Sequence, residues 1–131
     1  MTPQLLHRRH FGVDEARSLL TQIRARVDEL ARLKRSLDER GYNIYRHQFF
    51  GGPGPNGQPL HPEERRLVRI LEELETQGIQ VKGLETGLID FPHLRENGEE
   101  VYLCWLLGEE DIDFWHSIEA GFAGRRPIAE L

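Results

Sequence analysis

A long repeat of apolar positions, spaced alternately four and three residues apart, begins near the start of the chain. Its members are Ala16, Leu20, Ile23, Val27, Leu30, Lys34, Leu37, Gly41 and Ile44. This spacing gathers the apolar side chains into one coiled-coil-like stripe along an α-helix. Asp14 and Glu15 suit the first turn of such a helix, which we expect over residues 13–47. Gly41 would then lie inside the helix, at a cost of about 1 kcal/mol.

A segment rich in glycine and proline separates this helix from a second one. Residues 51–57 hold four glycines and two prolines, so we expect an irregular connector over residues 48–61. The segment lacks the Gly-Lys-Ser/Thr that a phosphate-binding P-loop requires. Pro62, followed by two glutamates, is typical of a helix start, and Gly78 is typical of a helix end. A helix over residues 62–78 follows, about half as long as the first.

Beyond this second helix the apolar period changes from about 3.6 to 2, which predicts strands. The candidates are residues 79–82, 88–91 and 101–107. We expect Pro92 to end the second strand, and Asn97-Gly98 is a turn signal before the third. The third strand is apolar on both faces, so it should be central and covered on both sides. We expect these strands to form a small antiparallel sheet within residues 79–107, as a meander or as a split arrangement.

A final group of apolar positions follows an acidic turn. Ile112, Trp115, Ile118 and Phe122 can share one helical face. They predict a short helix and an irregular tail within residues 109–131, and the helix would make Asp113, His116 and Glu119 neighbours. The predicted fold class is α+β: a long antiparallel helical hairpin packed with a small antiparallel β-sheet and a short C-terminal helix. This single domain would span residues 13–131, after an N-terminal arm of residues 1–12.

The difference in length between the two helices leads to a functional hypothesis. The second helix can cover only half of the first, and a bare remainder would expose on the order of several hundred Å² of apolar surface, more than monomers normally show. The sheet or a second copy of the chain must cover this remainder. The leading hypothesis is therefore a homodimeric interaction or scaffold protein without catalytic activity.

Composition and charge narrow the partners and the cellular compartment that we expect for this protein. The 131 residues carry a net charge of −5, but residues 1–47 carry +4 and residues 79–131 carry −7. The acidic half disfavours nucleic acid, and we expect the basic helix to offset it within the molecule or across a dimer. A single cysteine, Cys104, excludes an internal disulfide. Neither a membrane span nor a secretory signal is recognisable, so we expect a cytoplasmic protein.

Four residues of the acidic half could bind a transition metal: Asp90, Cys104, Glu109 and His116. Their spacing matches no standard zinc pattern, so Cys104 as a small buried residue and His116 as a salt-bridged histidine stay open. A carboxylate beside His116 could raise its basicity for general base catalysis, and Cys104 with His116 could form a nucleophile and its base. The cofactor that this set allows is a divalent metal, with Asp90, Glu109 and His116 as its ligands.

Two basic groups complete the candidate sites. Arg125 and Arg126 follow two glycines and could bind a carboxylate or phosphate. The favoured alternative is that they fix the tail to the acidic half through Glu109 or Asp111. Residues 7–10, His-Arg-Arg-His, are typical of a frayed basic arm with weak and unspecific metal affinity.

Several motifs together resemble a known family. They are Phe11-x-x-Asp14-Glu15-Ala16-x-x-Leu19-Leu20, Gly87-Leu88-Ile89-Asp90-Phe91-Pro92, Val101-Tyr102-Leu103-Cys104-Trp105, Gly108-Glu109, Trp115-His116 and Gly121-Phe122-Ala123-Gly124-Arg125-Arg126-Pro127. They resemble an uncharacterised bacterial family, the domain of unknown function 2203, over nearly the whole chain. The family offers no activity. The resemblance implies that Asp90, Glu109, His116, Gly121, Gly124 and Arg125 belong to one feature, which is either a pocket or a structural latch. The Gly/Pro-rich segment 51–57 is longer than is usual in this family.

Overall fold

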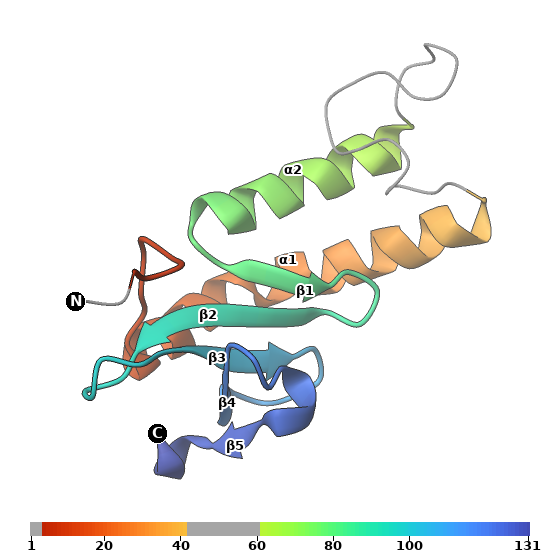
Figure 1. Ribbon diagram of the computed structural model, residues 1–131. Helices are drawn as coiled ribbons and strands as arrows, with labels where there is room; N and C mark the ends of the chain where they lie inside the picture. Colours follow the sequence, from red (N-terminus) through yellow and green to blue (C-terminus); the bar gives the residue numbers. More distant parts are fainter. Residues whose placement is uncertain (1–3, 42–60) are drawn as a thin grey trace.

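Two helices and a five-stranded antiparallel sheet make up the described part of the computed structural model, residues 4–41 and 61–131 (Figure 1). The helices are α1 (Val13–Glu39) and α2 (Pro62–Thr76). The strands are β1 (Gln80–Gly83), β2 (Leu88–Leu94), β3 (Glu100–Leu106), β4 (Phe114–Ser117) and β5 (Arg126–Pro127), with 3₁₀ turns η3 (Phe122–Gly124) and η4 (Ile128–Glu130). The predicted α+β class is confirmed. The predicted C-terminal α-helix is wrong, since residues 109–131 hold β4, β5 and only short 3₁₀ turns.

The first helix begins where the acidic turn predicts, and ends earlier than expected. Glu15 accepts a hydrogen bond from the Gly12 N–H at the N-cap, and α1 runs from Val13 to Glu39. Gly41 has a φ of 81°, a left-handed conformation that glycine adopts readily and that a continuing α-helix excludes. The prediction that the helix passes through Gly41 is therefore wrong. Residues 42–60, with the Gly/Pro connector, lie outside the described residues.

The second helix matches its prediction to within its last turn. Pro62 is its first residue, and the His61 side chain caps it by accepting from the Glu63 N–H at 3.1 Å. Exposed ion pairs join α2 to the antiparallel α1, among them Arg66 to Glu29 at 2.9 Å. Neither described helix has the length and apolar character needed to cross a membrane.

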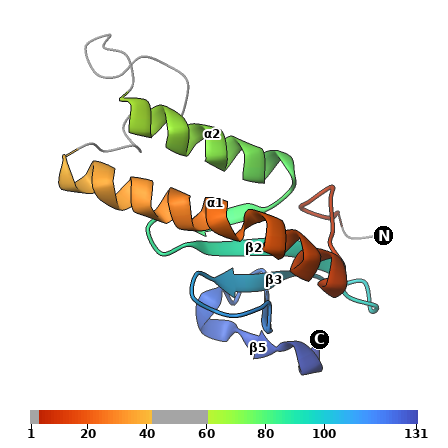
Figure 2. The same ribbon diagram turned by 180° about the vertical axis from the view of Figure 1, so that it is seen from behind.

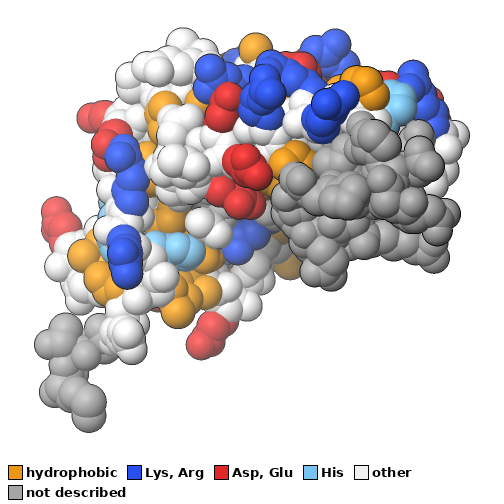
Figure 3. Space-filling model, turned by 90° about the horizontal axis from the view of Figure 1, so that it is seen from above, with side chains coloured by type: hydrophobic (Ala, Val, Ile, Leu, Met, Phe, Trp, Pro, Cys, Tyr) orange, Lys and Arg blue, Asp and Glu red, His pale blue; other side chains and the backbone are white. Residues whose placement is uncertain are grey.

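The apolar stripe of α1 is covered within one chain. Its N-terminal half lies across the sheet and its C-terminal half lies beside α2 (Figures 1 and 2). The buried residues of α1 are Ala16, Leu20, Ile23, Val27, Leu30, Ala31, Lys34 and Leu37. They include every predicted stripe position up to Leu37, so the argument for a dimer loses its premise. On the face seen in Figure 3, charged side chains of both signs separate small hydrophobic groups. Homodimerisation itself stays an untested prediction.

The sheet is a meander with the order β1-β2-β3-β4-β5, which resolves the choice left open above. The third strand is central, as predicted. The prediction that Pro92 ends β2 is wrong, because the strand continues to Leu94. Pairing with β1 stops at Asp90, and the Pro92 carbonyl accepts from the Phe11 N–H at 2.7 Å on that open edge. The missing N–H of proline therefore removes no ladder hydrogen bond.

The predicted helix around His116 is instead strand β4, paired with β3. Trp115 enters the core with 2% of its surface exposed, whereas His116 projects from the opposite face. Asp113 therefore no longer shares a face with His116, and the predicted Asp113–His116–Glu119 arrangement is wrong.

The two faces of the sheet have different roles. One carries Ile89, Phe91, Val101, Leu103, Trp105 and Trp115, which join the helices in the apolar core. The other carries Asp90, Tyr102, Cys104, Phe114 and His116 on β2, β3 and β4. This second face holds the candidate site.

Candidate functional site

Three potential metal ligands meet on the sheet face away from the helices. Asp90 in β2 and Cys104 in β3 are direct cross-strand partners, and His116 in β4 lies opposite Tyr102, two positions from Cys104. One ligand atom each of Asp90, Cys104 and His116 lies within 4.8 Å of the other two. The three residues are 2%, 0% and 3% exposed, respectively. Across residues 4–41 and 61–131, no other set of His, Cys, Asp or Glu forms such a group.

Both ring nitrogens of His116 face hydrogen-bond acceptors. Nδ1 lies 2.7 Å from the Ser117 carbonyl oxygen, and Nε2 lies 3.1 Å from each carboxylate oxygen of Asp90. A carbonyl only accepts, so Nδ1 carries a proton and Nε2 is directed to Asp90. Burial alone would lower the pKa of His116, but the hydrogen bonds to Asp90 and Ser117 outweigh it and raise this pKa.

Cys104 is a protonated thiol in this setting. Burial, followed by the negative charge of Asp90, raises the pKa of Cys104 to about 12. The nearby Arg125 guanidinium opposes this shift without overcoming it. A thiol with so high a pKa is a poor nucleophile near neutral pH, which disfavours the thiol-nucleophile hypothesis. Metal coordination deprotonates a cysteine directly, so metal binding stays chemically open.

Glu109 and Arg125 form a second unit beside the cluster. The guanidinium of Arg125 donates to both carboxylate oxygens of Glu109, at 2.9 and 3.0 Å, and stacks 4.2 Å from the Phe114 ring centre. Gly124 permits the tight turn before Arg125, because a Cβ there would lie 2.5 Å from that of Ala120. The carboxylate of Glu109 is thus paired with Arg125. The potential ligands that meet are Asp90, Cys104 and His116, and not the predicted set of Asp90, Glu109 and His116.

Arg126 does not converge with Arg125. It pairs with the exposed Glu130 at 2.9 Å and lies over the Trp115 ring at 5.3 Å. The two arginines therefore do not form a joint anion site, and the favoured alternative, contact of Arg125 with Glu109, is what the structure contains.

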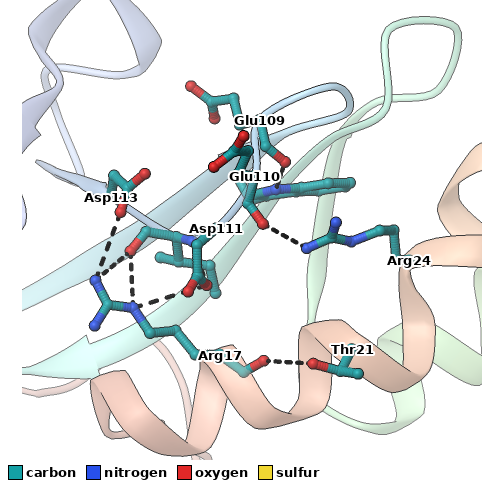
Figure 4. Close-up of polar contacts among 9 residues, drawn as sticks. Arg17, Thr21, Arg24, Glu109, Glu110, Asp111 and Asp113 are labelled. Carbon is teal, nitrogen blue, oxygen red and sulfur yellow. Dashed lines mark hydrogen bonds and ion pairs between the residues drawn. The ribbon is translucent and has the colours of Figure 1, made fainter.

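The segment that carries Glu109 is held by the basic side of α1 (Figure 4). Arg17 donates to the Ile112 carbonyl at 2.9 Å, and Arg24 donates to the Glu110 carbonyl at 2.6 Å. Arg17 also lies 3.8 Å from Asp111. The positive charge of the first helix thus meets the acidic C-terminal half within one molecule, as one of the two predicted arrangements required.

Residues 4–12 pack against the sheet, so the prediction of a frayed arm is wrong. The backbone N–H groups of Leu6 and His7 donate to Glu100 at 2.8 and 3.0 Å, and His10 Nε2 lies 2.7 Å from the same carboxylate. Phe11 is 1% exposed. Burial alone would raise the pKa of Glu100, but its hydrogen bonds with Leu6, His10 and His7 outweigh it and lower this pKa.

Three further residues border the cluster, namely His7, Lys82 and Tyr102, and none of them was predicted to lie there. The His7 ring lies 2.6 Å from the Tyr102 hydroxyl, and Lys82 Nζ lies 4.6 Å from the centre of the Tyr102 ring. The Tyr102 ring centre is 5.5 Å from that of His116. Tyr102 lies two positions from Cys104 on β3, so the two-residue period of a strand is a signal that finds Tyr102. No local pattern relates Lys82 or His7 to β3.

Comparison with known proteins gives a family without an assigned activity. A family model described as an uncharacterised conserved protein (DUF2203) matches residues 9–128, a range that includes the cluster, Glu109 and Arg125. A search of curated proteins and a search of solved structures each found no match. The resemblance drawn from the sequence motifs is confirmed, and the chain belongs to the uncharacterised conserved protein family DUF2203.

Proposed function

We propose that this protein binds one divalent transition metal ion, with Zn²⁺ as the first candidate, through Asp90, Cys104 and His116. Carboxylate oxygen, thiolate sulfur and imidazole nitrogen are the donors that zinc takes in proteins. The observation that carries the proposal is their convergence: one donor atom from each residue lies within 4.8 Å of the others in a buried site.

The orientation of His116 supports this proposal. Histidines that bind metals usually donate their other ring N–H to a carbonyl or carboxylate, which fixes the ring. The Nδ1 of His116 makes such a bond to the Ser117 carbonyl, at 2.7 Å, and leaves Nε2 directed to Asp90. A metal ion would replace the proton between Nε2 and this carboxylate.

The size and charge of the cluster also suit such an ion. Donor atoms around a tetrahedral zinc lie about 3.3–3.8 Å apart. The Asp90 oxygens already lie 3.1 Å from His116 Nε2, and no pair of the set exceeds 4.8 Å, so only the most separated pair would have to approach, by about 1 Å at most. The negative charges of Asp90 and a Cys104 thiolate would together balance a doubly charged ion. That balance removes the penalty for keeping two anionic groups in a buried site.

The competing interpretation is a structural latch. Asp90 and His116 can form a buried ion pair with the Cys104 thiol beside it, and this arrangement needs no ion. Removal of one partner from a buried pair is strongly destabilising, by about 3–5 kcal/mol. Loss of stability in a His116 variant therefore does not separate the two interpretations, whereas the response to added metal does.

The experiment is a metal titration of protein produced without a histidine tag. We expect one equivalent of Co²⁺ to produce a thiolate-to-cobalt charge-transfer band, and Zn²⁺ to compete for the site and raise the melting temperature. Cys104→Ser should lose the band. His116→Gln should weaken binding by more than the roughly 10–100-fold typical of outer-shell changes.

His93→Gln is the matched control. His93 lies on β2 outside the cluster, and its Nδ1 donates to the Phe11 carbonyl at 2.6 Å, as Nδ1 of His116 donates to the Ser117 carbonyl. This variant should keep the cobalt band and its intensity. A wild-type protein whose spectrum and melting temperature do not respond to cobalt or zinc would leave only the latch.

A further inference from the structure

We infer that the metal site keeps one open position for a small monoanionic oxygen ligand, such as a carboxylate, and that Lys82 binds this anion from β1. The inference rests on the proposed function, because it requires an ion at Asp90, Cys104 and His116. It adds the chemical class of the ligand and a residue that selects it.

The open position follows from where the ligands originate. All three project from one face of the sheet, from the neighbouring strands β2, β3 and β4. Zinc sites with three protein ligands commonly hold water or substrate in the fourth position. Because the sheet occupies one side of the ion, this fourth position points away from the sheet, toward the side chains that cover the face.

Lys82 is one of these covering side chains. It lies on β1, and its Nζ is 4.6 Å from the ring centre of Tyr102 on β3, so the two side chains meet across β2, the strand of Asp90. The same Tyr102 ring neighbours His116, at 5.5 Å between centres. The ammonium group therefore lies beside the cluster, on the side of the open position.

Charge balance favours a single negative charge on the ligand. Within the described residues, Arg125 near Cys104 is neutralised by the two-point contact with Glu109. Lys82 is exposed and belongs to none of the ion pairs found in those residues. A doubly charged ion, the Asp90 carboxylate and the Cys104 thiolate sum to zero. The Glu100 carboxylate on the same face is bound by the Leu6 and His7 N–H groups and by His10, so Lys82 adds one positive charge at the cluster. A carboxylate can place one oxygen on the metal and the other on the ammonium.

The test is a titration of the cobalt-loaded protein with sodium acetate, followed in the visible ligand-field bands. The wild-type spectrum should change and saturate. Lys82→Met keeps the length of the side chain without its charge, so it should retain the cobalt spectrum and bind acetate about tenfold more weakly. Lys82→Arg should recover most of the loss. Inorganic phosphate and chloride, titrated in parallel, test the preference for a carboxylate.

Arg126→Met is the matched control, because Arg126 is also an exposed cation over an aromatic ring of this sheet. It should leave acetate binding unchanged. Equal acetate affinity in wild type and Lys82→Met, or a cobalt spectrum that acetate does not alter, overturns the inference and leaves the metal proposal intact. Loss of acetate binding in Arg126→Met alone also overturns it. Protein that takes up no cobalt overturns both.

Discussion

Glu109 shows how one side chain can organise the surroundings of the cluster. Its Oε1 accepts from the Leu106 N–H at 2.8 Å at the end of β3, and its two oxygens hold Arg125 over Phe114. The sequence offered Glu109 both as a metal ligand and as a contact for Arg125, and in the structure this carboxylate is the counter-ion of Arg125. Glu109 therefore couples the end of β3 to the turn that precedes β5.

Glu109→Gln is expected to lower the free energy of unfolding by about 2–3 kcal/mol, because it leaves the partly buried Arg125 without its counter-ion. Urea denaturation measures the change. The neighbouring Glu110→Gln is the control, since Glu110 contributes its backbone carbonyl, and not its carboxylate, to the contact with Arg24. Equal losses in the two variants would contradict the assignment.

Sequence reasoning at this scale found the members of the cluster but not their arrangement. Asp90, Cys104 and His116 stood out by side-chain chemistry, and the family motifs placed Asp90 and His116 in one feature. Their contact depends on strand register, because a shift of one residue in β2 would turn Asp90 into the core. Lys82 reaches Tyr102 from a strand two positions away in the sheet, which no motif encodes.

Periodicity predicted the longer elements well and the short ones poorly. The stripe from Ala16 to Leu37 and the two-faced run in β3 each extend over several periods, so helix and strand are clearly distinguished. Strand β4 has only four residues, and its Trp115 fits a helical face as well as an alternating one. The apolar stripe predicted that the helix continues through Gly41. The backbone of Gly41 instead adopts a left-handed conformation, which the pattern of side chains does not reveal.

Two glycines in turns of the sheet allow the cost of a steric clash to be measured separately from the cost of backbone strain. Gly87 and Gly98 have φ of 71° and 88°, so alanine at either position costs about 1–2 kcal/mol. A Cβ on Gly87 would lie 2.6 Å from that of Leu107, whereas one on Gly98 would meet no atom within 4 Å. We expect Gly87→Ala to lose about 1–3 kcal/mol more than Gly98→Ala in urea denaturation. Equal losses would show that the turn at Gly87 can relax.

At the scale of the whole molecule, the sheet was one of the two alternatives expected to cover the remainder of the α1 stripe, and the structure has the sheet there. The stripe divides between two partners, with its first half on the sheet and its second half on α2 (Figure 2). Helical periodicity shows that a stripe needs cover but does not say which element supplies it. The same limit hid the docking of residues 4–12, which depends on Glu100, about 90 positions away in the sequence.

The docking of this arm should depend on pH through Glu100. Hydrogen bonds with Leu6, His10 and His7 outweigh burial and hold the pKa of Glu100 below its ordinary value of 4.5. A carboxyl group whose pKa is lowered by folding contributes stability that is fully present above its unfolded value. This contribution is lost as the pH falls through the lower, folded value. The arm should therefore stay docked at neutral pH and loosen only below about pH 4.5.

Amide hydrogen exchange tests this dependence residue by residue. Below pH 4.5, protection of the Leu6 and His7 amides should fall roughly ten- to a hundredfold after correction for intrinsic rates, because a neutral acid is a weaker acceptor. The Phe11 amide donates to the Pro92 carbonyl, which does not titrate, so it should keep its protection in the same spectra. In Glu100→Gln the Leu6 and His7 amides should exchange quickly at every pH. Parallel loss at Phe11 would mean that acid loosens the whole segment and that Glu100 does not control its docking.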